Sequence, residues 1–168
     1  MLIDMRYNKR HQPGFTLIEI LAVLFVLSIG LIGVLSLIVQ NVQSQNINKR
    51  TIAAYQLAQE GLELIRKVRD TNWKNGFDWN QDLGAGSYYM DYLDATPNLV
   101  VQQTDSELYF NVSGFYIHGG VSDPTPFSRT IEIIPIDAGS MRVYSHVVWY
   151  DRDKVFNYDL ETLFYDWR

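Results

Sequence analysis

The 168-residue sequence contains no cysteine. No disulfide can therefore stabilise any part of the chain, whichever compartment it enters. A folded domain must then rely on a hydrophobic core, and the 14% of aromatic residues supply ample material for one. The length leaves room for one such domain beside any terminal segment.

Basic residues are scarce in the C-terminal part of the chain. From Thr71 onward, 6 basic residues stand against 14 acidic ones, which gives a net charge of −8. A domain of that charge is repelled by phosphate backbones. The sequence therefore predicts no broad nucleic-acid-binding surface.

Recognisable catalytic motifs are missing as well. The three histidines, His11, His118 and His146, show no metal-ligand spacing. The sequence has no cysteine nucleophile, no phosphate-binding glycine loop and no Gly-x-Ser-x-Gly motif. We therefore expect neither an enzyme nor a cofactor site.

The segment from Trp73 to Gly86 is rich in Asn, Asp and Gly and predicts a structured loop. Within it, Asp78, Asn80 and Asp82 have the spacing that opens a calcium-binding loop. The rest of that pattern is absent, because Leu83 stands where the loop needs glycine and Tyr89 where it needs glutamate. A solvated turn is the expected structure, with no bound metal.

Near the N-terminus, the segment from Ile20 to Val39 contains no charged residue. Twenty helical residues at about 1.5 Å each span the roughly 30 Å hydrocarbon core of a bilayer. The segment therefore predicts one transmembrane helix. Glu19 stands at its start, where an unpaired carboxylate is costly and needs a partner.

Basic residues precede this segment, namely Arg6, Lys9 and Arg10. By the positive-inside rule they predict a cytoplasmic N-terminus and a C-terminal part outside the cytoplasmic membrane. A cleavable secretory signal has a shorter apolar region with a small-residue cleavage site after it. Here the apolar run is too long, and the polar residues Gln40-Asn41-Val42-Gln43 follow it.

The sequence Gly14-Phe15-Thr16-Leu17-Ile18-Glu19, followed by about twenty apolar residues, resembles the N-terminal signature of type IV pilins and pseudopilins. These are subunits of bacterial pili and of related secretion and DNA-uptake filaments. The resemblance implies that prepilin peptidase removes residues 1–14 by cleaving after Gly14, and that Phe15 is then N-methylated. It also implies that Glu19 pairs with the Phe15 amine during filament assembly, which relieves the cost of burying either charge alone.

Two features depart from many pilins. The leader of 14 residues is long, and the apolar segment has Gly30 and Gly33 but no proline. Both features favour a minor pilin over a major one. The glycines are either ordinary small residues of a transmembrane helix or positions that let the helix loosen or a neighbour approach closely.

Beyond the membrane segment, the helix is expected to continue. No proline interrupts residues 15–69, and Asp70-Thr71-Asn72 supplies a polar end. Between Asn46 and Arg69, apolar residues recur at three- and four-residue steps, which predicts one buried face. That face comprises Ala54, Leu57, Ala58, Gly61, Leu62, Ile65 and Val68.

The C-terminal part alternates apolar and polar residues, which predicts strands joined by short turns and therefore antiparallel pairing. The expected strands are Leu99–Gln103, Leu108–Ile117, Phe127–Ile136, Met141–Tyr150 and Phe156–Asp166. The buried helix face should pack on the sheet face bearing Val147 and Trp149. The predicted fold is α+β, a long N-terminal helix on an antiparallel meander, as the pilin resemblance also implies.

The predicted organisation is a cleaved leader (1–14), a transmembrane and assembly helix (15–40) and an extracytoplasmic head (41–168). The expected function is that of a minor pilin, with prepilin peptidase, other pilin subunits and an inner-membrane assembly platform as partners. A pseudopilin of a type II secretion or DNA-uptake system shares the signature. An adhesin is a third possibility, because the aromatic stretches Tyr88–Tyr92 and Phe115-Tyr116 could form a binding surface as well as core.

Overall fold

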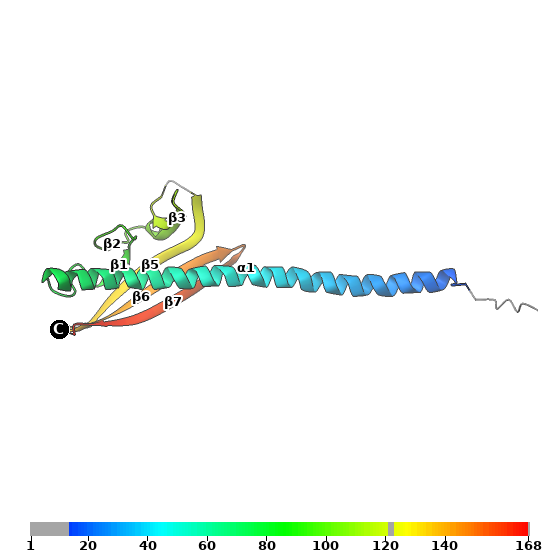
Figure 1. Cartoon of the computed structure of the whole chain (residues 1–168), viewed down its shortest axis with the longest axis horizontal. Coiled ribbons are helices and arrows are strands. Elements are labelled where there is room, and N and C mark those ends of the chain that lie inside the picture. Colours follow the sequence, from blue (N-terminus) through cyan, green and yellow to red (C-terminus); the bar gives the residue numbers. More distant parts are fainter. Residues whose placement is uncertain (1–13, 121–122, 168) are drawn as a thin grey trace, which may run out of the picture. The chain divides into compact units, whose positions relative to one another are not determined.

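The structure is a computed structural model that describes residues 14–120 and 123–167. Apart from Gly14, the predicted leader lies outside the described residues. The chain divides into two compact units, one ending at Gln45 and one beginning at Asn46. Helix α1 (Leu17–Asn75) contributes residues to both units (Figure 1).

In the first unit, every helical residue is exposed. Large apolar side chains such as Leu24, Leu27 and Val39 have more than half of their surface accessible. Ser28 donates its hydroxyl hydrogen bond to the carbonyl oxygen of Leu24 (2.7 Å), so its polar group is paired within the helix. In the described part of the chain, α1 is the one helix long and apolar enough to cross a membrane.

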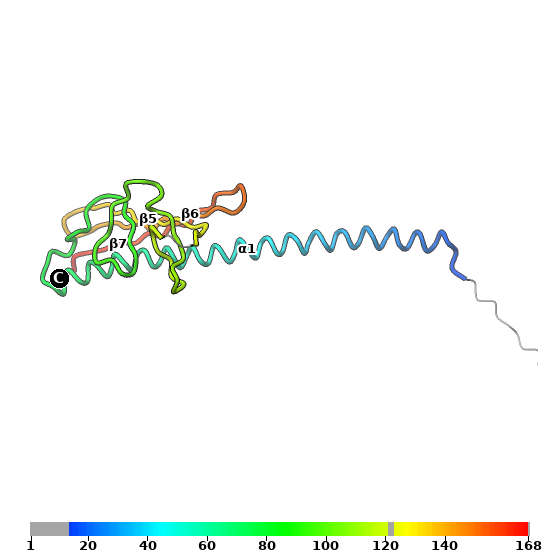
Figure 2. Tube along the Cα trace, turned by 90° about the horizontal axis from the view of Figure 1, so that it is seen from above, coloured from blue at the N-terminus to red at the C-terminus, as the bar shows by residue number. Residues whose placement is uncertain are grey.

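In the second unit, α1 buries one face against the sheet, as the periodicity predicts. Figures 1 and 2 both show this part of the helix lying along β5, β6 and β7. The predicted face is confirmed, because all seven of its residues are buried. Leu64, Asn72 and Trp73 are buried in addition.

The end predicted for the helix at Arg69 is wrong, because α1 continues to Asn75. The polar residues interpreted as a break have partners in the last turns: Thr71 bonds the carbonyl of Lys67, and the buried Asn72 amide donates to the carbonyl of Gln81 (2.8 Å). Gly76 then adopts φ 77°. The backbone N–H groups of Gly76 and Phe77 donate hydrogen bonds to the carbonyls of Trp73 and Asn72, which together form a Schellman motif.

One seven-stranded sheet covers the helix, and all its strand pairs are antiparallel. Strand β5 is central: it pairs with β6 along one edge and with β1 and β3 along the other. On the outer sides, β2 pairs with β1, β4 pairs with β3, and β7 pairs with β6. Only β5, β6 and β7 form the predicted meander. The strands are β1 (Gly86–Tyr89), β2 (Asn98–Leu99), β3 (Glu107–Phe110), β4 (Tyr116–His118), β5 (Asp123–Asp137), β6 (Ser140–Asp151) and β7 (Lys154–Tyr165).

The α+β class is confirmed, but the region before β5 differs from the prediction. The strand expected at Leu99–Gln103 shrinks to β2 and is followed by a 3-10 helix, Gln103–Ser106. The strand expected at Leu108–Ile117 is a hairpin of β3 and β4, because Gly114 takes φ 80° and the Asn111 side chain accepts two backbone bonds in the turn. Strand β1 was not predicted.

The core between helix and sheet consists of two clusters of buried residues. One contains Ile65 and Val68 with Val143 of β6, and the other contains Leu57 with Val147 and Trp149. The predicted contact is confirmed, because Val143, Val147 and Trp149 lie on the same face of β6 and the two clusters together set the buried helix face against it. The last turn of α1 also meets the C-terminal end of the chain, where the Trp73 and Trp167 rings lie 4.6 Å apart.

Candidate processing and assembly site

The candidate site is built around the first turn of α1. Gly14, Phe15 and Thr16 precede the helix, which begins at Leu17. The Thr16 hydroxyl accepts a hydrogen bond from the backbone N–H of Glu19 (3.3 Å). Thr16 is thus the N-cap, and it satisfies a donor that a helix start otherwise leaves unpaired.

Glu19 lies three residues after this cap, where its carboxylate faces the positive end of the helix dipole. Thr16 and Glu19 therefore have the spacing of a capping box, and the structure shows its threonine half. The arrangement fixes where the helix starts. It also places the Glu19 carboxylate in the first turn, directly before the apolar segment.

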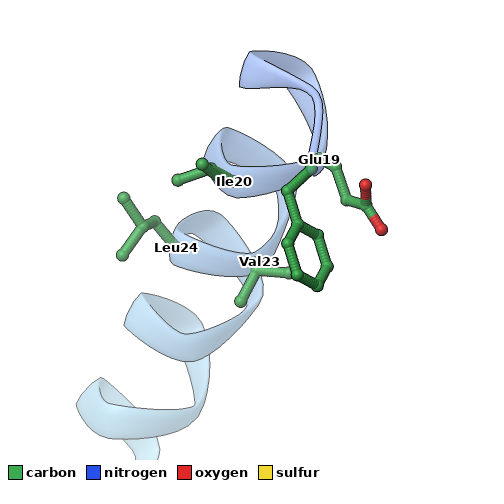
Figure 3. Close-up of a pocket in the computed structure, with 5 residues that line it drawn as sticks. Glu19, Ile20, Val23 and Leu24 are labelled. Atoms are coloured by element: carbon green, nitrogen blue, oxygen red, sulfur yellow. The ribbon is translucent and has the colours of Figure 1, made fainter. Parts of the chain in front are cut away.

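Phe15 and Glu19 lie on one side of the helix start, where they line a shallow hollow together with Ile20, Val23 and Leu24. Figure 3 shows the Glu19 carboxylate directed away from the side chains of Ile20 and Leu24. The carboxylate is thus free to meet a cation at the helix surface. Among the predicted site residues, the structure brings Phe15 and Glu19 together.

Gly14 stands at the edge of the described residues with open space around it. A Cβ atom added there would meet no described atom within 4 Å. The chain's own described structure therefore does not demand glycine at this position. If glycine is needed there, the requirement comes from a molecule that acts on the chain.

The apolar surface that follows has no cover within its own unit. Exposed fractions of large apolar side chains range from 80% at Phe15 to 51% at Ile20. A continuous apolar surface of this kind marks contact with lipid or with other proteins. The helix start thus combines an exposed apolar surface with one carboxylate.

A family model described as the prokaryotic N-terminal methylation motif matches residues 9–35. This chain carries a type IV prepilin signal. The match covers Gly14, Phe15 and Glu19, and it includes most of the apolar segment. Comparisons with curated proteins and with solved structures found no match.

The prepilin signal implies processing by prepilin peptidase and assembly with other pilins. It indicates a structural subunit and not an enzyme. Together with the exposed apolar helix, it is consistent with a membrane-anchored protein.

The head contains a buried ionic cluster that sequence analysis missed. The Arg129 side chain, from β5, is 0% exposed; it donates hydrogen bonds to the carbonyls of Leu57 (3.3 Å) and Met90 (2.7 Å). Burial lowers the pKa of Arg129, while the carboxylates of Glu60 (3.3 Å) and Asp91 (3.9 Å) oppose that shift. Arginine retains its charge even so.

His118, from β4, completes this cluster. Its Nδ1 lies 2.6 Å from an Asp91 carboxylate oxygen, and its backbone N–H donates to the other oxygen (2.9 Å). The cluster joins α1, β4, β5 and the segment after β1. Apart from Arg129 Nε, which has no hydrogen-bond partner among the described residues, its charged groups pair with one another or with backbone carbonyls, so we assign it a structural role. No periodicity could have revealed it, because Arg129 occupies an inward position in an otherwise regular strand.

His146 lies on the other face of the sheet, between acidic residues of the two neighbouring strands. Its Nδ1 is 2.7 Å from Asp159 of β7, and its Nε2 is 3.3 Å from Glu132 of β5. The two carboxylates approach opposite sides of the ring and do not converge on one point. No group of three or more histidine or acidic residues within the described ranges is arranged to hold a metal ion.

The segment with calcium-like spacing folds as successive turns pinned by Trp79 and Leu83, which are 6% and 2% exposed. The side-chain amide of Asn72 donates hydrogen bonds to the backbone carbonyls of Trp79 and Gln81 in this segment. The apolar side chain of Leu83, which breaks the calcium pattern in the sequence, therefore has a place in the core. Asp82 adopts φ 63°, a conformation that Asp tolerates better than most residues.

Proposed function

We propose that the chain is the precursor of a minor pilin of a type IV pilus. Prepilin peptidase cleaves it after Gly14, the new N-terminal residue Phe15 is methylated, and residues 15–40 form the helix that first crosses the cytoplasmic membrane and then packs in the filament. Residues 41–168 form a head on the extracytoplasmic side. The N-terminus of the precursor is cytoplasmic.

The observation that carries this proposal is the coincidence of the prepilin signal with the first turn of α1. A side chain at Gly14 would meet no described atom, Phe15 lies directly before the N-cap Thr16, and Glu19 is the carboxylate at the start of the apolar segment. Cleavage after Gly14 would create an amine about one helical turn from Glu19. An amine and a carboxylate that are each costly to bury singly favour pairing.

In a filament, we assign this pair to two subunits. The Phe15 amine of one subunit would meet the Glu19 carboxylate of its neighbour and so set the axial register between their helices. The open hollow beside Phe15 and Glu19 supports this arrangement, because it leaves room for side chains of an adjacent helix.

The decisive experiment is mass spectrometry of the N-terminal peptide from cells with active prepilin peptidase. We expect a peptide that begins at methylated Phe15. Gly14→Val should abolish cleavage and leave the described structure intact, because a Cβ there meets no described atom. Gly30→Val is the matched control and should be processed normally. An intact leader in the unmodified chain would refute the proposal.

A pseudopilin of a type II secretion or DNA-uptake system would be processed in the same way. What distinguishes a minor pilin from a pseudopilin is the kind of filament that the protein enters. Genes for a pilus assembly ATPase next to this one would favour the pilus, whereas neighbouring secretion genes would favour the pseudopilin. Recovery of the protein in filaments sheared from cells would decide for the pilus.

An adhesive head is a second candidate, and one observation favours it. The rings of Tyr92 and Phe115 pack 5.2 Å apart and are 37% and 54% exposed, next to the more exposed Leu93. Exposed aromatic residues suit contact with sugars or proteins. The other aromatic residues of the predicted surface are better covered, since Tyr88 is buried and Tyr89 and Tyr116 are partly buried. Loss of host-surface attachment by Phe115→Ala filaments of normal length would establish this role.

A further inference from the structure

Strand β7 forms a long free edge of the sheet. It pairs with β6 from Lys154 to Tyr165 without a register shift, and with no other strand that the structure describes. Its 12 residues make it about twice as long as a typical strand. An edge of this length presents a row of backbone groups that no neighbour satisfies.

The hairpin before β7 shows which residues present these groups. Asp151 and Lys154 face each other across a two-residue turn, and such a turn is closed by a hydrogen-bonded pair. Hydrogen-bonded positions then alternate along an antiparallel ladder. The even-numbered residues of β7 therefore bond to β6. The odd-numbered residues, such as Asn157 and Asp159, direct their N–H and C=O groups to the free edge.

Features that protect edge strands are scarce in β7. The strand has no proline and no bulge, and its one lysine, Lys154, is its first residue. Natural edge strands usually carry such features to prevent pairing with other chains. The charged groups in the middle of the strand are the carboxylates of Asp159 and Glu161, so they restrict which chain can pair here, whereas the backbone itself is not blocked.

The inner face of β7 is also less covered than that of its neighbour. Phe156, Tyr158 and Leu160 are only partly buried, whereas Val143 and Val147 of β6 are fully buried. A hollow lies between α1 and β7, lined by Gln59, Leu62, Glu63, Arg66, Leu160, Glu161 and Thr162. An added strand would cover the partly buried residues and place inward side chains beside this hollow.

A second copy of β7 brings no cation opposite the carboxylates of Asp159 and Glu161, because Lys154, its one basic residue, lies at an even-numbered position and these two residues at odd-numbered ones. In a symmetric antiparallel pair, a two-fold axis at Leu160 sets Asp159 opposite Glu161 of the other copy. An axis at Asp159 or Glu161 sets that residue opposite itself. Like charges directly opposite each other destabilise a strand pair. These two carboxylates, each 47% exposed, contact His146 and Arg142 of β6, and β7 has no basic residue after Lys154.

We infer that the β7 edge is a strand-addition site for an extended segment of a different protein, one that alternates apolar residues on its inner face with basic residues opposite Asp159 and Glu161. Backbone hydrogen bonds would provide the affinity, and the charges would select the partner. This inference goes beyond the proposed function and does not depend on leader cleavage or filament entry.

The test uses the full chain in detergent micelles and a fluorescent synthetic peptide in which lysine and valine alternate. We expect saturable binding by fluorescence anisotropy, with slower hydrogen exchange at the odd-numbered amides of β7. The same peptide with glutamate in place of lysine should bind about tenfold more weakly or worse. Equal binding of the two peptides would overturn the assignment of a basic partner.

Asn157→Pro removes one outward N–H and no bond to β6, so it should fold and lose about tenfold or more in peptide affinity. Asn157→Ala keeps the N–H and should bind as the unmodified chain does. Unchanged binding by a folded Asn157→Pro chain would overturn the proposal. If that variant does not fold, Asp159→Lys with Glu161→Lys leaves the backbone unaltered and should reverse the peptide preference; failure to reverse it would also overturn the proposal.

Discussion

The two parts of helix α1 differ in what covers their apolar residues. From Leu17 to Gln45 every residue of the helix is exposed, although the segment from Ile20 to Val39 has no charge. From Asn46 onward the helix has ten buried residues, covered by the sheet and loops of its own unit, and exposes charged ones such as Glu63 and Arg66. One continuous helix thus contains a part whose apolar surface is satisfied within the chain and a part whose surface is not.

This difference separates two physical roles. The second part stabilises the head, because its apolar residues gain burial when the head folds. The first part gains burial only from lipid or from other helices. Substitutions in the two parts should therefore affect different measurements, and matched pairs of variants test the separation.

The largest effect is expected at Glu19. Glu19→Ala should be inserted and cleaved yet nearly absent from sheared filaments, because the Phe15 amine of the neighbouring subunit loses its partner; Glu19→Asp should be intermediate. Quantitative immunoblotting of filament and membrane fractions measures this. Glu63→Ala, in the second part of the same helix, should assemble normally. Normal incorporation of Glu19→Ala would leave Glu19 as no more than a recognition residue for the peptidase.

A large effect on folding is expected at the ionic cluster that α1 shares with β5. Arg129→Met leaves the carboxylates of Glu60 and Asp91 without their buried cation and should lower the free energy of unfolding by about 3–5 kcal/mol. Arg142→Met, which removes a half-exposed pair with Glu161, should lower it by about 0–1 kcal/mol. Denaturant unfolding of the full chain in detergent, followed by tryptophan fluorescence, compares them. Equal losses would refute the structural role of the cluster.

Ile65 and Leu27 compare the two parts of the helix directly. Ile65 is 0% exposed, so Ile65→Ala should lower the free energy of unfolding of the head by about 2–5 kcal/mol. Leu27 is 62% exposed in the other unit, and Leu27→Ala should leave the head's unfolding unchanged. The same denaturation experiment applies. A head that is equally stable after Ile65→Ala would show that the wrong helix face had been assigned to the core.

A smaller effect is expected at Gly61, where α1 approaches β6 closely. A Cβ added there would lie 2.5 Å from the Ser145 hydroxyl, so Gly61→Ala should destabilise the head by about 1–3 kcal/mol through overpacking. Gly61→Ala combined with Ser145→Gly should recover most of the loss. Gly33→Ala meets no described atom within 4 Å and is the control. No loss at Gly61 would mean that the contact adapts without strain.

Much of this molecule follows from local sequence patterns. The apolar stripe at helical spacing and the alternation in β5, β6 and β7 are periodic, and each period corresponds to one backbone geometry. The uncharged segment is recognised by its length and by its lack of charge. The residues of the helix start also follow from the sequence, since Thr16 and Glu19 have capping-box spacing that could have identified the N-cap. These features depend on residues a few positions apart.

Tertiary structure decided the features that depend on residues far apart in the chain. Helix α1 extends to Asn75 because Asn72 and Trp73 become buried, and polar residues that suggest a break in isolation gain partners there. Strand β1 exists because β5 offers it an edge. Arg129 is buried because α1 and the segment after β1 supply acceptors from 72 and 39 residues away. No local sequence pattern encodes such long-range contacts, since the free energy that favours them arises only when the chain has folded.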